Sequence, residues 1–208
     1  MLFFKLLTIL SAAFLIYCFE DGKIVGGNDV NIARYPFVVS LNFFGWHICG
    51  GSIIGKRSVL TAAHCLQGVY PLYLTIYAGS RYRTLPMQRV PVLSAKIHEK
   101  YNRESIENDI AIIWLRFDLV FSRRILPVAL PIQDEEVYPN TKAQILGWGR
   151  TEGDSGGPLV TSGKLAGIVS SRNFVTGLGK IPMSNLLPII YSAKKDLIFK
   201  RIHTDHVL

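Results

Sequence analysis

The chain has 208 residues, of which 49% are hydrophobic and 18% charged, and this balance predicts a packed globular protein rather than a disordered one. The formal net charge is +8, which favours acidic proteins, glycans or anionic membranes as contacts. Because no nucleic-acid motif is present, we read this charge as a contribution to solubility and expect no nucleic acid among the partners. The three cysteines exclude a dense disulfide scaffold.

The N-terminus begins with a lysine-containing stretch and then an apolar run over residues 6–19, interrupted only by Thr8 and Ser11. This run is too short for a comfortable membrane span and predicts a secretory signal peptide over residues 1–19. An uncleaved membrane anchor is the alternative. Secretion implies an extracellular, oxidising compartment, with no stable membrane insertion after the signal is removed.

A short polar segment, residues 20–23, separates the apolar run from Ile24-Val25-Gly26-Gly27. Cleavage after Lys23 by a protease that cuts at lysine would remove residues 20–23 as a propeptide and free the ammonium group of Ile24. The alternative is an ordinary flexible entry to a strand.

Several stretches have the β-branched and aromatic content of strands. We expect strands over residues 35–44, 73–78, 89–97, 142–149 and 165–170, and therefore an all-β fold. Residues 188–202 predict one C-terminal helix, because a proline opens the segment and an apolar stripe follows at helical spacing.

His64 lies near the end of the block Val59-Leu60-Thr61-Ala62-Ala63-His64-Cys65, which predicts a strand leading into a short helical turn. Histidine has an ordinary pKa near 6.5, so it can accept and return a proton at neutral pH. His64 is therefore a candidate general base.

Asp109 opens the apolar stretch Ile110-Ala111-Ile112-Ile113. A carboxylate at the start of a buried strand is costly unless it has a partner. Pairing with His64 would provide that partner, whereas a turn aspartate at a strand start is the alternative.

Ser155 lies in Gly153-Asp154-Ser155-Gly156-Gly157-Pro158-Leu159. Glycines let backbone N–H groups approach a reacting carbonyl closely, and a serine hydroxyl becomes a nucleophile when a base takes its proton. A glycine-rich turn between strands is the simpler reading of this block alone.

Together these blocks resemble the trypsin/chymotrypsin family of serine proteases, over residues 24–202. The resemblance implies two perpendicular β-barrels with a C-terminal helix and a protease domain over residues 24–208. It also implies a Ser155–His64–Asp109 triad and an oxyanion hole made by the N–H groups of Gly153 and Ser155. Neither a cofactor nor a metal is implied.

The same resemblance implies further roles. The Ile24 ammonium would pair with Asp154 after cleavage at Lys23, and Cys49 would bond to Cys65, while Cys18 would leave with the signal. His47 would contact the nucleophile-loop aspartate before activation, or it is a plain polar strand residue. Substrate would lie along the end of the strand expected over residues 165–170 and the two residues after it, which together are Ser170, Ser171 and Arg172.

The sequence departs from the family between Glu152 and Gly153, where family members carry roughly forty more residues. The second barrel is therefore expected to be incomplete, with open strand edges and with Ile145 and Leu159 deprived of apolar partners. The residue at the base of the specificity pocket has no counterpart.

Three functions follow as hypotheses. The first is a secreted serine endopeptidase acting on protein or peptide substrates, activated by a trypsin-like protease and open to protein inhibitors. The second is a catalytically impaired homologue that binds partners. The third is a truncated isoform of a longer enzyme.

The Lys23–Ile24 junction generates a prediction about processing. Secreted protein treated with trypsin should yield the N-terminal sequence Ile-Val-Gly-Gly, because the cut follows Lys23. Edman sequencing checks this result, and retention of the chain in the membrane would contradict it.

Overall fold

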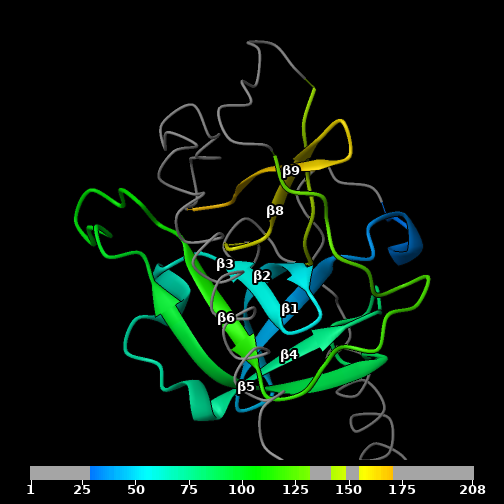
Figure 1. Cartoon of the computed structure of the whole chain (residues 1–208), viewed down its shortest axis with the longest axis horizontal. Helices are drawn as coiled ribbons and strands as arrows, with labels where there is room; N and C mark the ends of the chain where they lie inside the picture. Colours follow the sequence, from blue (N-terminus) through cyan, green and yellow to red (C-terminus); the bar gives the residue numbers. More distant parts are fainter. Residues whose placement is uncertain (1–28, 132–141, 149–154, 171–208) are drawn as a thin grey trace, which may run out of the picture.

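The computed structural model describes residues 29–131, 142–148 and 155–170, and Figure 1 shows them as a β-barrel with a smaller sheet beside it. The expected signal peptide, propeptide and C-terminal helix lie outside these residues. Within the part of the chain that is described, no helix is long and apolar enough to span a membrane.

Six antiparallel strands close the barrel in the order β1-β2-β3-β6-β5-β4. Their bounds are Val38–Phe43 (β1), Trp46–Gly55 (β2), Ser58–Thr61 (β3), Leu74–Ala78 (β4), Gln88–Ile97 (β5) and Ala111–Leu115 (β6). Three single 3-10 turns, η1 (Ile32–Arg34), η2 (His64–Leu66) and η3 (Pro71–Tyr73), lie in the connections. The strands expected over residues 35–44, 73–78 and 89–97 are confirmed with shifts of a few residues at their ends.

The barrel core follows from the alternation of side chains along its strands. In β4 the residues Leu74, Ile76 and Ala78 are buried and the two between them are not, which is the pattern of a strand with one face inward. Most of β6 is buried, because it lies between β3 and β5 and is also covered on its outer face. Each fully buried Leu or Ile contributes about 1.5–3 kcal/mol to folding.

The described residues of the second half form a three-stranded antiparallel sheet, and the second barrel is incomplete, as expected. Its strands are Gln144–Ile145 (β7), Pro158–Thr161 (β8) and Lys164–Ile168 (β9), in the order β7-β8-β9. Of the strand expected over residues 142–149, only two residues pair as strand.

The apolar residues of this sheet do not behave alike. Ile145 is exposed, as expected of a strand that has lost its neighbours. The same expectation for Leu159 is wrong, because Leu159 is only 7% exposed. It lies in the central strand, paired with Ile145 on one side and Gly167 on the other, and β8 also packs on β2 of the barrel.

Glycines allow the sheet and the barrel to meet closely. A Cβ added to Gly50 in β2 would lie 2.8 Å from the Cα of Gly157, and one added to Gly156 would lie 2.3 Å from Thr61 Oγ1. The backbone N–H of Gly50 also donates to the carbonyl of Ser155 at 2.8 Å. The turn that carries Ser155 is therefore pressed onto strands β2 and β3 of the barrel.

Two glycines test this contact as a matched pair, because Gly156 and Gly163 have φ of +80° and +76° but only Gly156 is crowded. Gly163→Ala should lower the free energy of unfolding by about 1–2 kcal/mol, the cost of a side chain in the left-handed region. Gly156→Ala should cost about 1–3 kcal/mol more, because its methyl group meets the barrel. Urea denaturation measures both, and equal losses would contradict the packing described above.

Candidate active site

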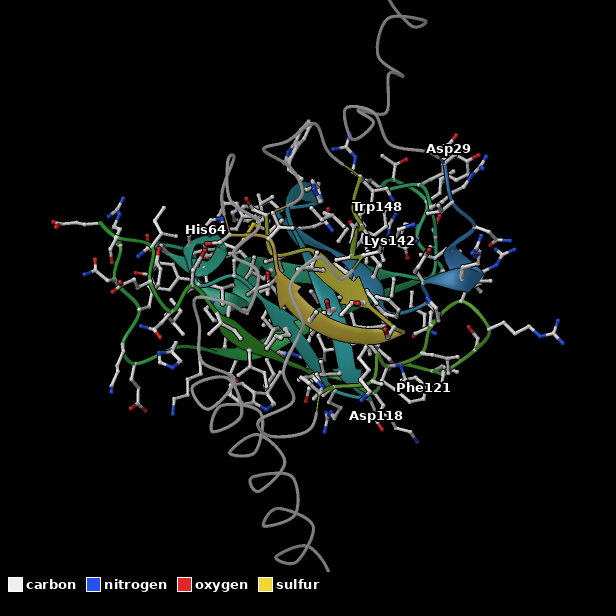
Figure 2. The ribbon with its side chains drawn as sticks, turned by 90° about the horizontal axis from the view of Figure 1, so that it is seen from above. Asp29, His64, Asp118, Phe121, Lys142 and Trp148 are labelled. Atoms are coloured by element: carbon white, nitrogen blue, oxygen red, sulfur yellow. A yellow bond between two sulfur atoms is a disulfide. The ribbon has the colours of Figure 1, made fainter. Side chains whose placement is uncertain are left out.

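His64 begins η2 directly after β3, and its sequence neighbours explain its position. Ala62 and Ala63 are fully buried, so the chain turns sharply against the barrel before His64 emerges with 29% of its side chain exposed. A disulfide joins Cys65 to Cys49 of β2, with their Cα atoms 6.2 Å apart. The predicted disulfide is confirmed, and it fixes the turn that carries His64, labelled in Figure 2.

Asp109 is buried just before β6, and its carboxylate receives three hydrogen bonds. His64 Nδ1 lies 2.7 Å from Oδ2, and the backbone N–H of His64 donates to Oδ1 at 2.8 Å. The hydroxyl of Ser170, at the end of the segment after β9, also donates to Oδ2. These donors satisfy a carboxylate that is only 1% exposed.

Asn108 shapes the approach to this carboxylate. Its φ is +54°, a left-handed conformation that asparagine tolerates better than most residues. Its side-chain amide donates to the carbonyl of Lys100 at 3.0 Å, which ties the preceding loop to the start of the strand. The Asn-Asp pair in the sequence thus makes a bend that turns Asp109 inward.

The His64–Asp109 bond defines which ring nitrogen can act as a base. A neutral imidazole that donates from Nδ1 to a carboxylate carries no proton on Nε2. Nε2 is then available to accept a proton from a nearby hydroxyl. The arrangement therefore has the chemistry of an oriented general base.

Tyr101 interacts electrostatically with the same carboxylate. Burial raises the pKa of Tyr101, and the charge of Asp109 raises it further, while Arg103 opposes both. The phenol is therefore neutral throughout the range in which a histidine base would work, and it adds no second charge beside Asp109.

Ser155 lies in the turn before β8 and is largely buried. Its carbonyl is held by Gly50, but among the described residues no hydrogen bond joins its hydroxyl to His64. His64 Nε2 instead lies 3.6 Å from Cys65 Sγ. The structure brings His64 and Asp109 together and leaves the Ser155 hydroxyl unconnected to them.

Several predicted site residues lie outside the described part of the chain. They are Lys23, Ile24, Gly153, Asp154, Ser171 and Arg172, so the activation pair and one oxyanion donor stay predictions. Ser170 is described, and its side chain is directed to Asp109. Sequence reasoning assigned Ser170 to substrate and missed this contact, since its partner lies 61 positions away.

His47 in β2 contacts the hydroxyl of buried Ser40 through Nδ1 at 2.7 Å. Asn42 donates to the same hydroxyl at 2.9 Å, and the Trp148 ring lies edge-on to the His47 ring, with 6.3 Å between centroids. His47 is therefore an oriented residue of β2, and its ring lies beside Trp148, which follows β7 by three positions. The expected contact with Asp154 involves a residue outside the described part.

One group of metal-type ligands occurs among the described residues, formed by Cys49, His64 and Cys65, with ligand atoms within 4.8 Å of one another. Both sulfurs belong to the disulfide. Metals bind the thiolate form of cysteine, and a disulfide sulfur is not a thiolate. Cys49, His64 and Cys65 therefore offer no metal-binding donor set while the disulfide is intact.

Comparison with known proteins gives a consistent picture. The family model described as Trypsin matches residues 24–153. Trypsin epsilon of Drosophila erecta is 42% identical over 146 residues, which cover 70% of this chain but only 56% of the relative. Trypsin beta of the same species is 36% identical over 198 positions, covering 72% of this chain and 78% of the relative.

The alignment with trypsin beta also measures what this chain lacks. Since 72% of 208 residues is about 150, about 48 of the 198 aligned positions have no counterpart in this chain. This number is close to the roughly forty residues expected to be missing between Glu152 and Gly153.

Solved structures share the fold at lower identity. Human heparin binding protein aligns with a TM-score of 0.64 and 23% identity, covering 69% of this chain and 82% of its own. The scabies mite inactivated protease paralogue S-D1 aligns with a TM-score of 0.63 and 21% identity, covering 70% and 85%.

The disulfide beside His64 generates a stability prediction. The Cys49→Ser/Cys65→Ser double variant should lose roughly 3 kcal/mol of unfolding free energy, because the bridge closes a loop of 16 residues. Chemical denaturation measures the loss. Two titratable thiols in the denatured wild-type protein would contradict the assignment.

Proposed function

Since the chain belongs to the trypsin family of serine proteases, we propose that it is a secreted serine endopeptidase that cleaves peptide bonds through an acyl-enzyme. The observation that carries this proposal is the hydrogen bond between His64 Nδ1 and buried Asp109. It supplies the oriented base that the chemistry requires, and Ser155 lies in a turn pressed onto the strand that leads to His64.

In the proposed mechanism, Ser155 Oγ attacks the carbonyl carbon of the substrate while its proton passes to His64 Nε2. Asp109 stabilises the imidazolium that forms and keeps Nδ1 protonated. His64 then gives the proton to the leaving amine as the C–N bond breaks. Water attacks the ester by the same proton transfers in reverse, releasing the acid and restoring Ser155.

The negative charge on the tetrahedral oxygen would be held by the N–H groups of Gly153 and Ser155. Each such donor contributes roughly 3 kcal/mol in comparable sites. Substrate would lie along Ser170, Ser171 and Arg172. Because the Ser170 hydroxyl is committed to Asp109, its contact with substrate would be made by the backbone.

We propose further that the chain is made as a zymogen. Cleavage after Lys23 would free the Ile24 ammonium to pair with Asp154, and this pair would order the oxyanion hole. His47 supports this proposal. Its ring is hydrogen-bonded to Ser40 and lies beside the ring of Trp148, and Trp148 precedes Asp154 by six positions in the sequence. A histidine there can hold the aspartate before cleavage.

A second candidate is a catalytically impaired homologue that acts by binding. The unconnected Ser155 hydroxyl and the roughly 48 absent positions favour it. Two solved structures with this fold have names that describe a binding protein and an inactivated protease. The two candidates differ in whether Ser155 is activated in this short chain.

A fluorophosphonate probe separates them, because it labels an activated serine whatever the substrate preference. After cleavage at Lys23, we expect the chain to be labelled on the order of 10²-fold more slowly than a variant with a family-like segment restored between Glu152 and Gly153. The restored variant should lose all labelling on Ser155→Ala. Mass spectrometry of the labelled peptide locates the site.

The result that would contradict slow labelling is rapid, stoichiometric reaction of the short chain at Ser155. Absence of labelling in the restored variant, with a folded barrel by circular dichroism, would overturn the endopeptidase proposal itself. In that case the binding function would be the better description.

A further inference from the structure

The positive charge of the chain is concentrated in two segments. Residues 79–91 contain three arginines and no acidic residue, and residues 116–126 contain three arginines and one aspartate. These 24 residues therefore carry five of the eight net positive charges of the whole chain. We call them together the arginine surface.

The fold brings the two segments side by side. The side-chain amide of Gln88 donates to the carbonyl of Val120 at 2.7 Å and accepts from the Val120 N–H at 3.0 Å. The N–H of Arg116 donates to the carbonyl of Pro91 at 2.9 Å. In Figure 2, Asp118 and Phe121 of the second segment lie together on one side of the molecule.

The arginines of this surface are exposed or half-buried, and several are held by their own neighbours. Arg81 lies over the Tyr82 ring at 4.6 Å and donates to its hydroxyl, and Arg89 lies over the Tyr77 ring at 4.9 Å. The tight turn between Ser122 and Ile125 presents Arg123 and Arg124. The guanidinium groups are therefore partly pre-oriented, which lowers the entropy lost on binding.

Large apolar side chains are exposed among these arginines. They are Tyr82, Leu85, Met87, Phe117, Val120 and Leu126, with exposed fractions from 41% to 70%. An exposed apolar patch among polar residues is typical of an interaction site. It also gives a partner a source of binding free energy that salt does not screen.

The composition of the surface indicates the kind of partner. All six cations are arginine and none is lysine, and the apolar residues include Tyr, Met and Phe. Arginine, methionine and aromatic residues are enriched in protein–protein interfaces, where lysine is depleted. Arginine also binds carboxylates with two parallel hydrogen bonds.

We propose that the arginine surface binds an acidic segment of a partner protein, one in which carboxylates alternate with apolar or aromatic side chains. The carboxylates pair with the arginines, and the apolar side chains cover residues such as Leu85 and Phe117. A sulfated glycan would leave the apolar residues uncovered. A lipid surface would be served equally well by lysine.

The test uses the full chain and a fluorescent peptide containing glutamate, aspartate and phenylalanine but no lysine or arginine. Arg123→Glu/Arg124→Glu should weaken peptide binding at least about tenfold, measured by fluorescence anisotropy. The charge-matched control Lys100→Glu/Arg103→Glu, on an exposed loop outside the surface, should change binding less than about twofold. Near-UV circular dichroism checks that both variants are folded.

A second matched pair tests the apolar part, because Leu85 on the surface and Leu72 outside it are both 69% exposed. Leu85→Ser should weaken binding severalfold even in high salt, and Leu72→Ser should not. A peptide with every carboxylate replaced by its amide should not bind the wild-type chain.

Three results would overturn the proposal. The first is an equal loss of binding in the two charge-reversal variants, which would indicate unspecific attraction. The second is failure of the wild-type chain to bind the acidic peptide. The third is the finding that the arginines are needed for binding heparin or phosphatidylserine vesicles but not for binding the peptide.

Discussion

The structure depends on one buried carboxylate. Asp109 is almost completely removed from water, and an unpaired charge there would cost several kcal/mol. Its hydrogen-bond partners come from two distant parts of the chain, which are the turn after β3 and the end of the segment after β9, while Asp109 itself lies just before β6. Satisfying this charge therefore fixes the position of the small sheet against the barrel as well as the ring of His64.

A second constraint acts at the glycines between barrel and sheet. Gly50 and Gly156 let the backbone after Ser155 approach β2 and β3 more closely than any side chain would permit. The Gly50 N–H donates to the carbonyl of Ser155 at this approach, which holds the turn against β2. Within the described residues, His64 and Asp109 form a hydrogen-bonded unit to which the Ser155 hydroxyl is not joined.

The parts that could be predicted from the sequence are those encoded in local blocks. The residues around His64 and Asp109 allowed their pairing to be inferred, the family resemblance implied the Cys49–Cys65 bridge, and the β-branched and aromatic content of residues 35–44, 73–78 and 89–97 predicted three of the barrel strands. The bond from Ser170 to Asp109 could not be inferred, because it joins sheet to barrel across 61 positions. The burial of Leu159 was missed for a similar reason, since Leu159 lies in the central strand of a sheet whose outer strands β7 and β9 come from separate parts of the chain.

The arginine surface shows the same limit. Its two segments are separated by 24 residues in the sequence and become neighbours only through the pairing of β5 with β6. In the sequence alone, the positive charge indicates only a contribution to solubility. On the folded barrel, the arginines of the two segments form a patch with apolar side chains among them.

The measurement that tests this account most directly is a proton NMR spectrum of the folded 208-residue chain. A proton held between His64 Nδ1 and the buried Asp109 carboxylate should resonate far downfield of the amide region, in the wild type and equally in Ser155→Ala. The account predicts that Asp109→Asn abolishes this signal. A folded wild-type chain without the signal, or a signal that survives in Asp109→Asn, would contradict the account.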